Sequence, residues 1–182
     1  MKATETLKHE HVVIGQALKV LAAMAGRVAA DDPPPAPDLA ALLEFFTAFA
    51  DGCHHAKEET ILFPALERAG LTHGRGPLAV MLDQHERGRQ LVAALRAAQP
   101  DLAHDAGARQ RFAAAARDYV SLLDQHIAIE NGVLFPGADR MLTPERDAEI
   151  AAAFDRHEEV EMGPAVHRRF HRMLDELGAR YL

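Results

Sequence analysis

Two segments of the chain carry the same arrangement of histidine, glutamate and proline. One reads His54-x3-Glu58 and the other His126-x3-Glu130, and each glutamate is followed after three residues by Leu-Phe-Pro. Residues four apart on a helix lie one turn apart on the same face, so a histidine and a glutamate can reach one metal centre. Imidazole and carboxylate suit iron, manganese or zinc better than copper(I), which prefers sulfur donors. The repeat therefore predicts a metal-ligating pair in each segment.

A single histidine precedes each of these segments, His11 in the first half of the chain and His85 in the second. Each half thus reads as a helical hairpin in which one helix supplies one histidine and the next supplies the His/Glu pair. Four nitrogens and two carboxylates can hold two metal ions when the carboxylates bridge them. Two divalent ions would also offset the large cost of burying two carboxylates.

The register of these donors leaves two alternatives open. His55 and Glu59 offer the same spacing as His54 and Glu58, and His9 lies close to His11. Counting back from Leu-Phe-Pro aligns His54 and Glu58 with the second segment, so we prefer that pair. Ferritin-like di-iron bundles use Glu-x-x-His, which does not occur in this sequence.

Four long helices are expected to position these donors. Alanine and leucine are abundant and β-branched runs of strand length are missing, which predicts an all-α fold. The proline-rich residues 31–37 form a linker, Asp38 is the expected N-cap of the second helix, and residues 70–76 form a loop. Thr143 is the expected cap of a C-terminal extension that breaks at Gly163. The predicted helices cover residues 4–27, 38–68, 77–100 and 106–140, with the bundle spanning residues 1–142 and the extension residues 143–182.

The composition of the whole chain narrows the classes of function. The 182 residues are 48% hydrophobic and 26% charged, with a net charge of −7, which argues against nucleic acid as a partner. No apolar run reaches about 18 residues, so a membrane-spanning helix is not expected. The start of the chain leads directly into an amphipathic pattern, and the single cysteine, Cys53, suits a reducing cytoplasm.

The sequence resembles the hemerythrin-like HHE cation-binding family over about residues 5–142. The resemblance lies in His11 and in residues 53–64, 76–77 with 80–89, and 126–136. It implies an up-down-up-down four-helix bundle with a non-heme di-iron centre in which the two glutamates bridge; manganese or zinc are possible substitutes for iron. By position the implied metal ligands are His11, His54, Glu58, His85, His126 and Glu130.

Two departures from the oxygen-carrying hemerythrins bear on function. Arg89 stands where the carriers have a second histidine on the third helix, and Asn131 stands where they place an aspartate, so that Glu130 is used instead. The pattern is closer to bacterial di-iron proteins linked to repair of iron centres after nitrosative or oxidative stress. The resemblance therefore implies a cytoplasmic stress-response protein that binds or reacts with oxygen, peroxide or nitric oxide, without a nucleic acid or membrane partner. The alternative is a module that senses or stores iron or oxygen without turnover.

Further residues have a structural and a functional interpretation. Cys53 is expected to be a buried, inert thiol, and Tyr119 to pack in the core or to support the metal ligands from outside. Asp51 and Asp124 are candidates for orienting the ligand histidines. The extension carries histidines and a glutamate at helical spacing, either on solvent-exposed faces or as part of a lid or a second metal site: His157, Glu161, His167 and His171.

Overall fold

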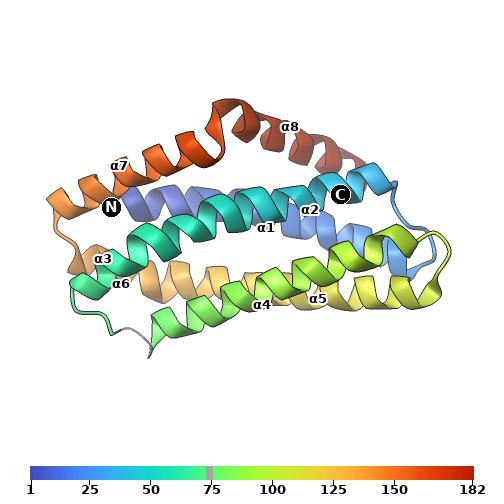
Figure 1. Cartoon of the computed structure of the whole chain (residues 1–182), viewed down its shortest axis with the longest axis horizontal. Helices are drawn as coiled ribbons and strands as arrows, with labels where there is room; N and C mark the ends of the chain where they lie inside the picture. The colour runs from blue at the N-terminus through green and yellow to red at the C-terminus, as the bar shows by residue number, and fades with distance from the viewer. Residues whose placement is uncertain (73–75) are drawn as a thin grey trace.

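A computed structural model describes residues 1–72 and 76–182, and these residues form an all-α protein (Figure 1). Four long helical segments run alternately up and down, and two further helices follow, so the predicted fold class is confirmed. The first segment is α1 (Lys2–Ala29), and the second combines α2 (Ala36–Phe45), η1 (Phe46–His55), η2 (Glu58–Leu62) and α3 (Phe63–Arg68). The third is α4 (Pro77–Ala98) with η3 (Gln99–Asp101), and the fourth combines α5 (Ala106–Ile129), η4 (Glu130–Leu134) and α6 (Phe135–Met141). The extension consists of α7 (Pro144–Glu161) and α8 (Gly163–Tyr181).

The helix ends agree with the sequence in two places and correct it in one. The Thr143 hydroxyl accepts from the Arg146 backbone N–H at 3.3 Å, as expected of an N-cap, and Gly163 separates α7 from α8 with a φ of +68° that glycine adopts freely. The prediction that Asp38 is an N-cap is wrong. Pro35 occupies that position, and the Asp38 carboxylate instead accepts hydrogen bonds from Arg180 and from the Tyr181 hydroxyl. The loop expected at residues 70–76 includes residues 73–75, which lie outside the described residues.

The helix widens to π-helical geometry at the same place in both repeats, in η2 and η4. The Phe63 N–H bonds to the Glu58 carbonyl and the Phe135 N–H to the Glu130 carbonyl, one residue further back than in an α-helix. The proline that follows each phenylalanine has no N–H and crowds the carbonyl four residues before it, which favours a wider turn. The shared Leu-Phe-Pro motif therefore shapes the backbone that carries each glutamate.

The apolar side chains form two clusters with a polar layer between them. In α1, Leu7 belongs to one cluster and Ile14 to the other, with His11 between them; in α4, Met81 and Leu91 flank His85 in the same way. Each helix of the bundle therefore crosses from one cluster to the other, and its polar residues meet in the middle.

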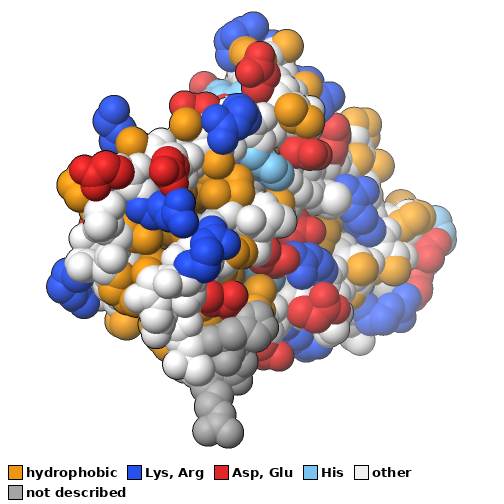
Figure 2. All heavy atoms as spheres, turned by 60° about the vertical axis from the view of Figure 1, so that its left-hand side comes forward, with side chains coloured by type: hydrophobic (Ala, Val, Ile, Leu, Met, Phe, Trp, Pro, Cys, Tyr) orange, Lys and Arg blue, Asp and Glu red, His pale blue; other side chains and the backbone are white. Residues whose placement is uncertain are grey.

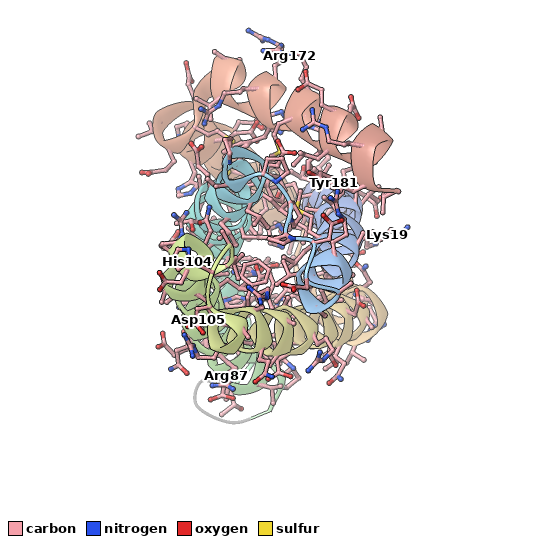
Figure 3. All side chains as sticks on the ribbon, turned by 90° about the vertical axis from the view of Figure 1, so that its right-hand side faces the viewer. Lys19, Arg87, His104, Asp105, Arg172 and Tyr181 are labelled. Atoms are coloured by element: carbon pink, nitrogen blue, oxygen red, sulfur yellow. The ribbon has the colours of Figure 1, made fainter. Side chains whose placement is uncertain are left out.

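The extension lies across one side of the bundle, and its apolar residues join both clusters. Helix α7 packs on α1, η1 and η2, and α8 packs on α1 and α2 (Figures 1 and 3). Phe154 belongs to one apolar cluster and Phe170 to the other. The Asp147 carboxylate also accepts from the backbone N–H groups of Lys2 and Ala3 at 2.9 and 3.0 Å, which ties α7 to the first turn of α1. The division of the chain into a bundle over residues 1–142 and an extension over residues 143–182 stays a prediction.

One sequence-based exclusion was too strong. Helix α1 is long and apolar enough to cross a membrane by length and composition alone. The core helix of a soluble protein passes the same test, and α1 buries Leu7, Ile14 and Leu21 completely within this fold. On the face seen in Figure 2, basic and acidic side chains are interspersed with apolar ones.

Candidate metal centre

The six predicted donors meet in the polar layer between the two apolar clusters. None of the six is more than 4% exposed, although histidine and glutamate are usually among the more exposed residues of a protein. They come from all four segments of the bundle: His11, His54, Glu58, His85, His126 and Glu130.

The donor atoms form two sets of four that share both glutamates. One set joins His11 and His54 to Glu58 and Glu130, and the other joins His85 and His126 to the same pair; the ligand atoms of each set lie within 4.8 Å of one another. The Nε2 atoms of His11 and His54 are 3.1 Å apart, and those of His85 and His126 are 3.2 Å apart. Glu130 Oε2 lies 3.1 Å from His11 Nε2 and 3.2 Å from His126 Nε2, so one carboxylate faces both histidine pairs.

The outward-facing nitrogen of each of these histidines has an oxygen partner. His54 Nδ1 lies 2.8 Å from Glu10 Oε2 and His85 Nδ1 2.7 Å from Glu59 Oε1. His126 Nδ1 lies 3.0 Å from the Gln84 side-chain oxygen, and His11 Nδ1 lies 3.0 Å from that of Asn131. An oxygen acceptor holds the proton on Nδ1, and the Nε2 lone pair is then directed into the centre.

These four outer partners repeat as the donors do. Glu10 and Gln84 stand directly before His11 and His85, and each accepts from the histidine of the next helix in its own half. Glu59 and Asn131 stand directly after Glu58 and Glu130, and each accepts from the single histidine of the other half. The sequence analysis missed Glu10, Gln84 and Asn131 in this role, although their places beside the repeated donors were the signal.

The electrostatics of the centre favour bound cations. All four carboxylate oxygens of Glu58 and Glu130 are buried without a hydrogen-bond partner among the described residues. Burial and the charge of Glu130 raise the pKa of Glu58 well above its usual value. Burial also acts to raise the pKa of Glu130, but His126 and His11 outweigh it, and that pKa lies below its usual range. Inward lone pairs on four imidazoles and two orphaned carboxylates fit two metal ions, which would satisfy both.

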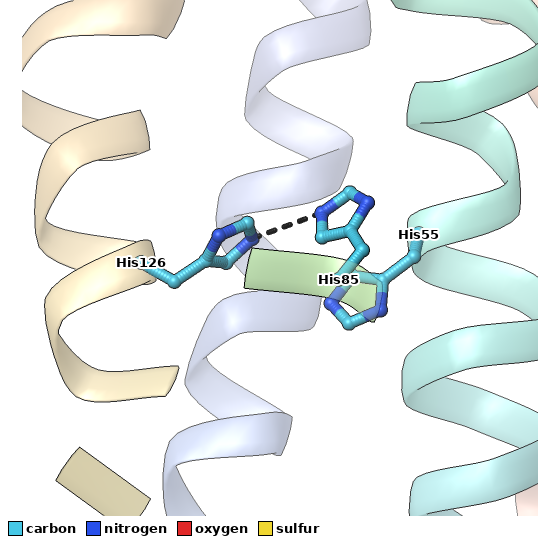
Figure 4. A group of neighbouring side chains, drawn as sticks. All are labelled: His55, His85 and His126. Carbon is cyan, nitrogen blue, oxygen red and sulfur yellow. Dashed lines mark hydrogen bonds between the residues drawn. The ribbon is translucent and has the colours of Figure 1, made fainter. Parts of the chain in front are cut away.

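The alternative register has other roles. His9 is exposed, and Glu59 bonds to His85 and Arg89 outside the donor sets. His55 is buried and stacks on His85, with ring centroids 4.0 Å apart, and one of its nitrogens lies near those of His85 and His126 (Figure 4). It is thus a fifth imidazole beside the centre.

A buried lysine connects the centre to the extension. The Lys57 ammonium has no exposed surface, pairs with Glu10 and lies 3.7 Å from Glu158 Oε2 of α7. Burial alone would lower the pKa of Lys57, but the Glu10 carboxylate outweighs it and raises that pKa. Cys53 fits the expected inert thiol, because burial raises its pKa to about 11.

The remaining candidates lie outside the two donor sets. Asp124 is exposed, so its expected orienting role is wrong, and Asp51 lies 3.5 Å from His55 Nδ1 without contacting a predicted ligand. Tyr119 packs edge-on against Phe46. In the extension, His157 lies 3.4 Å from the Gly52 carbonyl, and Glu161 is exposed. The rings of His167 and His171 are tilted by 48°, with their centroids 4.7 Å apart. Among the described residues, these four side chains form no group of three metal donors.

Comparison with known proteins identifies the family of the chain. The sequence model of the hemerythrin HHE cation-binding domain matches residues 2–138, and again residues 77–182. The chain belongs to this family. The second match begins at α4, as expected if the half that contains His85 and His126 repeats the first half.

Relatives of the chain include larger proteins. An uncharacterized protein of Mycobacterium tuberculosis is 32% identical over 170 residues, which are 92% of this chain and 62% of the relative. The iron-sulfur cluster repair protein YtfE of Enterobacter sp. is 32% identical over 88 residues, 47% of this chain and 40% of that protein. YtfE of Yersinia pseudotuberculosis is 32% identical over 108 residues, 58% of this chain and 47% of that protein. This HHE domain therefore spans less than two thirds of the length of these relatives.

Proposed function

We propose that the chain is a non-heme di-iron protein that reacts with a small oxidant: oxygen, peroxide or nitric oxide. The observation that carries this proposal is the pair of four-donor sets that share Glu58 and Glu130. Each ion would be held by two histidines and by oxygens of both carboxylates, His11 with His54 on one side and His85 with His126 on the other. Two iron ions bound there would supply electrons to the oxidant.

The donor chemistry is compatible with iron, and equally with manganese or zinc. Four imidazole nitrogens and four carboxylate oxygens suit all three metals, whereas calcium and magnesium prefer oxygen alone. The role of this chain's residues is to hold the Nε2 lone pairs inward through Glu10, Glu59, Gln84 and Asn131. The two apolar clusters lie on either side of this polar layer.

Reaction is favoured over reversible oxygen carriage by the place of Arg89. Its guanidinium is turned to Asp51 and Glu59 and supplies no nitrogen to the donor sets. The second ion would therefore have fewer protein ligands than in an oxygen carrier. The YtfE relatives, named for repair of iron-sulfur clusters, support a role in oxidative or nitrosative stress. A cytoplasmic location, and the lack of a nucleic acid or membrane partner, belong to the same proposal.

Anaerobic reconstitution with Fe(II) tests the proposal. We expect two iron ions per chain, and an oxidised optical spectrum after exposure to air that persists when oxygen is removed. Recovery of the colourless reduced form by deoxygenation alone, over repeated cycles, would indicate an oxygen carrier. Uptake of no iron, with the fold intact, would reject the di-iron assignment. The exposed His9 offers a control, since His9→Ala should behave as the unchanged chain.

A sensing function is the second candidate, and the contact between the centre and the extension favours it. His54, Glu10, Lys57 and Glu158 form a continuous polar chain from the donor sets to α7. A change of charge at the centre would alter this chain and so the seating of α7. The two functions differ in turnover: a reactive protein consumes many equivalents of peroxide or nitric oxide, and a sensor binds stoichiometrically.

A further inference from the structure

A pocket of about 310 Å³ lies between η1 and α4 and reaches the metal centre at His55. Its walls include Thr47, Asp51, Gly88, Arg89 and Tyr119. The buried end of the pocket is lined by His55 and Tyr119, and the exposed Ala93 and Arg96 line its outer end. The pocket therefore connects the protein surface with the histidine next to the second donor set.

His55 has spare hydrogen-bonding capacity at the inner end of this pocket. The side chain is 3% exposed, and neither ring nitrogen has a hydrogen-bond partner among the described residues. Its Nδ1 faces Asp51 Oδ1 at 3.5 Å, too far for a good hydrogen bond. A buried imidazole with two unsatisfied nitrogens is costly, and a polar molecule bound beside it would remove that cost.

The orientation of His55 distinguishes it from the metal ligands. Its ring is nearly parallel to that of His85, at an interplanar angle of 17° and a centroid distance of 4.0 Å (Figure 4). Nitrogen lone pairs lie in the ring plane, so two stacked imidazoles direct them side by side and not towards one ion. One nitrogen of each of His55, His85 and His126 lies within 4.8 Å of the others, but the stacked orientation places His55 better to contact a molecule next to the metal site than to share an ion with His85.

The charges around the pocket favour a polar or anionic occupant. Arg96 lines the pocket and donates to the Leu43 carbonyl and the Thr47 hydroxyl, both uncharged, at 3.0 Å each. Arg89 is held against Asp51, 2.9 Å away, and against Glu59. One guanidinium of this pocket is thus matched by carboxylates, while the other is bound to neutral oxygens.

We propose that this pocket binds the small molecule that reacts at the centre, and that His55 is the residue that holds it there by a hydrogen bond. The ligand class is a small polar molecule or inorganic anion, which among the proposed reactants fits peroxide best. This inference rests on the proposed di-iron function, because it assigns the ligand site of that centre. His55 from η1 and Arg89 from α4 line the same pocket.

Azide binding to the iron-loaded, oxidised protein tests the inference, with optical titration as the readout and the iron content measured first. His55→Leu should keep two iron ions and bind azide at least about tenfold more weakly, as loss of a hydrogen bond to a charged group implies. His55→Gln, which can still donate, should recover part of the affinity. His9→Leu is the matched control on an exposed histidine. Ala93→Trp, at the exposed rim of the pocket, should slow azide association.

Each outcome decides the inference. Unchanged azide affinity in His55→Leu, with two iron ions retained, would overturn it and leave the di-iron function standing. Loss of one iron ion from His55→Leu would also overturn it, since His55 would then be a metal ligand. If His55→Leu folds poorly, the association rate of Ala93→Trp decides instead, and an unchanged rate rejects this pocket as the route. Absence of iron from the unchanged chain would reject the proposed function itself.

Discussion

The two hairpins of the bundle, α1 to α3 and α4 to α6, supply the same donors but differ in what surrounds them. The outer partners from the first hairpin are carboxylates, Glu10 and Glu59, whereas those from the second are the amides of Gln84 and Asn131. Each carboxylate is paired with a cation of its own, Lys57 or Arg89, and the amides need none. The repeat thus supplies the candidate metal ligands, and the first hairpin alone supplies the charged groups that contact them from outside.

The difference between the two hairpins also explains why the metal centre is reached from one side only. Ile127 follows His126 directly, where the first hairpin has His55 after His54, and Ile129 stands where the first hairpin has Lys57. Among the described residues, the second hairpin therefore has no buried histidine, lysine or carboxylate besides its three candidate ligands. The first hairpin places Lys57 under α7 and His55 at the end of the pocket. The side of the centre next to Lys57 is therefore covered by the extension, and the side next to His55 is reached from solvent through the pocket.

Replacing either shared glutamate should have the largest effect, and an equal one, because Glu58 and Glu130 belong to both donor sets. Glu58→Ala and Glu130→Ala should each bind iron far more weakly than a variant of an outer partner, for which a loss of about 10–100-fold is usual. Metal analysis after reconstitution with limiting iron measures this, with Glu59→Ala as the outer-partner control. Two tightly bound ions in Glu130→Ala would show that this carboxylate does not bridge.

The charged and neutral outer partners should differ in stability when the protein is metal-free. Glu10→Ala leaves the buried Lys57 ammonium without its main partner and should lower the free energy of unfolding by about 3–5 kcal/mol. Gln84→Ala removes one hydrogen bond to a neutral group and should cost about 1 kcal/mol. Urea denaturation of the two variants measures the difference. Equal losses would mean that Glu158 alone suffices to pair Lys57.

The polar His55 of the first hairpin should make the metal-free protein sensitive to acid. Burial and the neighbouring His85 lower the pKa of His55 to about 3, so the native state keeps it neutral while the unfolded chain protonates it below about pH 6.5. The unfolded state therefore binds a proton that native His55 does not. The free energy of unfolding keeps its full value above pH 6.5 and decreases as the pH falls below it. Between pH 6.5 and 5, the chain should lose about 2 kcal/mol relative to His55→Gln. Parallel pH profiles of unfolding for the two proteins would contradict this.

Of the four predicted effects, the effect of removing Arg89 on the stability of the fold should be the smallest. The Arg89 side chain is 36% exposed, and its partners Asp51 and Glu59 are partly exposed as well. Such ion pairs contribute about 0–1 kcal/mol, so Arg89→Ala should change the midpoint of denaturation little. Arg87→Ala, on the exposed side of the same helix, is the control. A loss of unfolding free energy as large as that of Glu10→Ala would mean that the ion pairs of Arg89 beside the pocket stabilise the fold as much as the pairing of Lys57 with Glu10 does.

The sequence predicted the fold class and brought the six candidate ligands together, because helical spacing determines which residues share a face. The outer partners could not be predicted from helical spacing, because each contacts a histidine of another segment. The acceptor of His11, for example, is Asn131 of the fourth segment, and only the packing of the segments shows this pair. Asp38 was misassigned because Pro35 and Pro37 start the helix earlier than a polar cap would. The pairing of Lys57 with Glu10, and the place of His55 beside a pocket, depend on how the helices are rotated against one another.

The capping of α1 by Asp147 has a consequence for how the molecule is made. The backbone N–H groups at the start of α1 find their acceptor in a helix that is synthesised after the whole bundle. The donor sets likewise need residues from His11 to Glu130. During synthesis, the first hairpin therefore emerges with three donors and no partner hairpin to complete either set. Either set of four candidate donors is therefore complete only once residues up to Glu130 have been made, whereas the buried pair of Lys57 and Glu10 lies within the part of the chain that is made first.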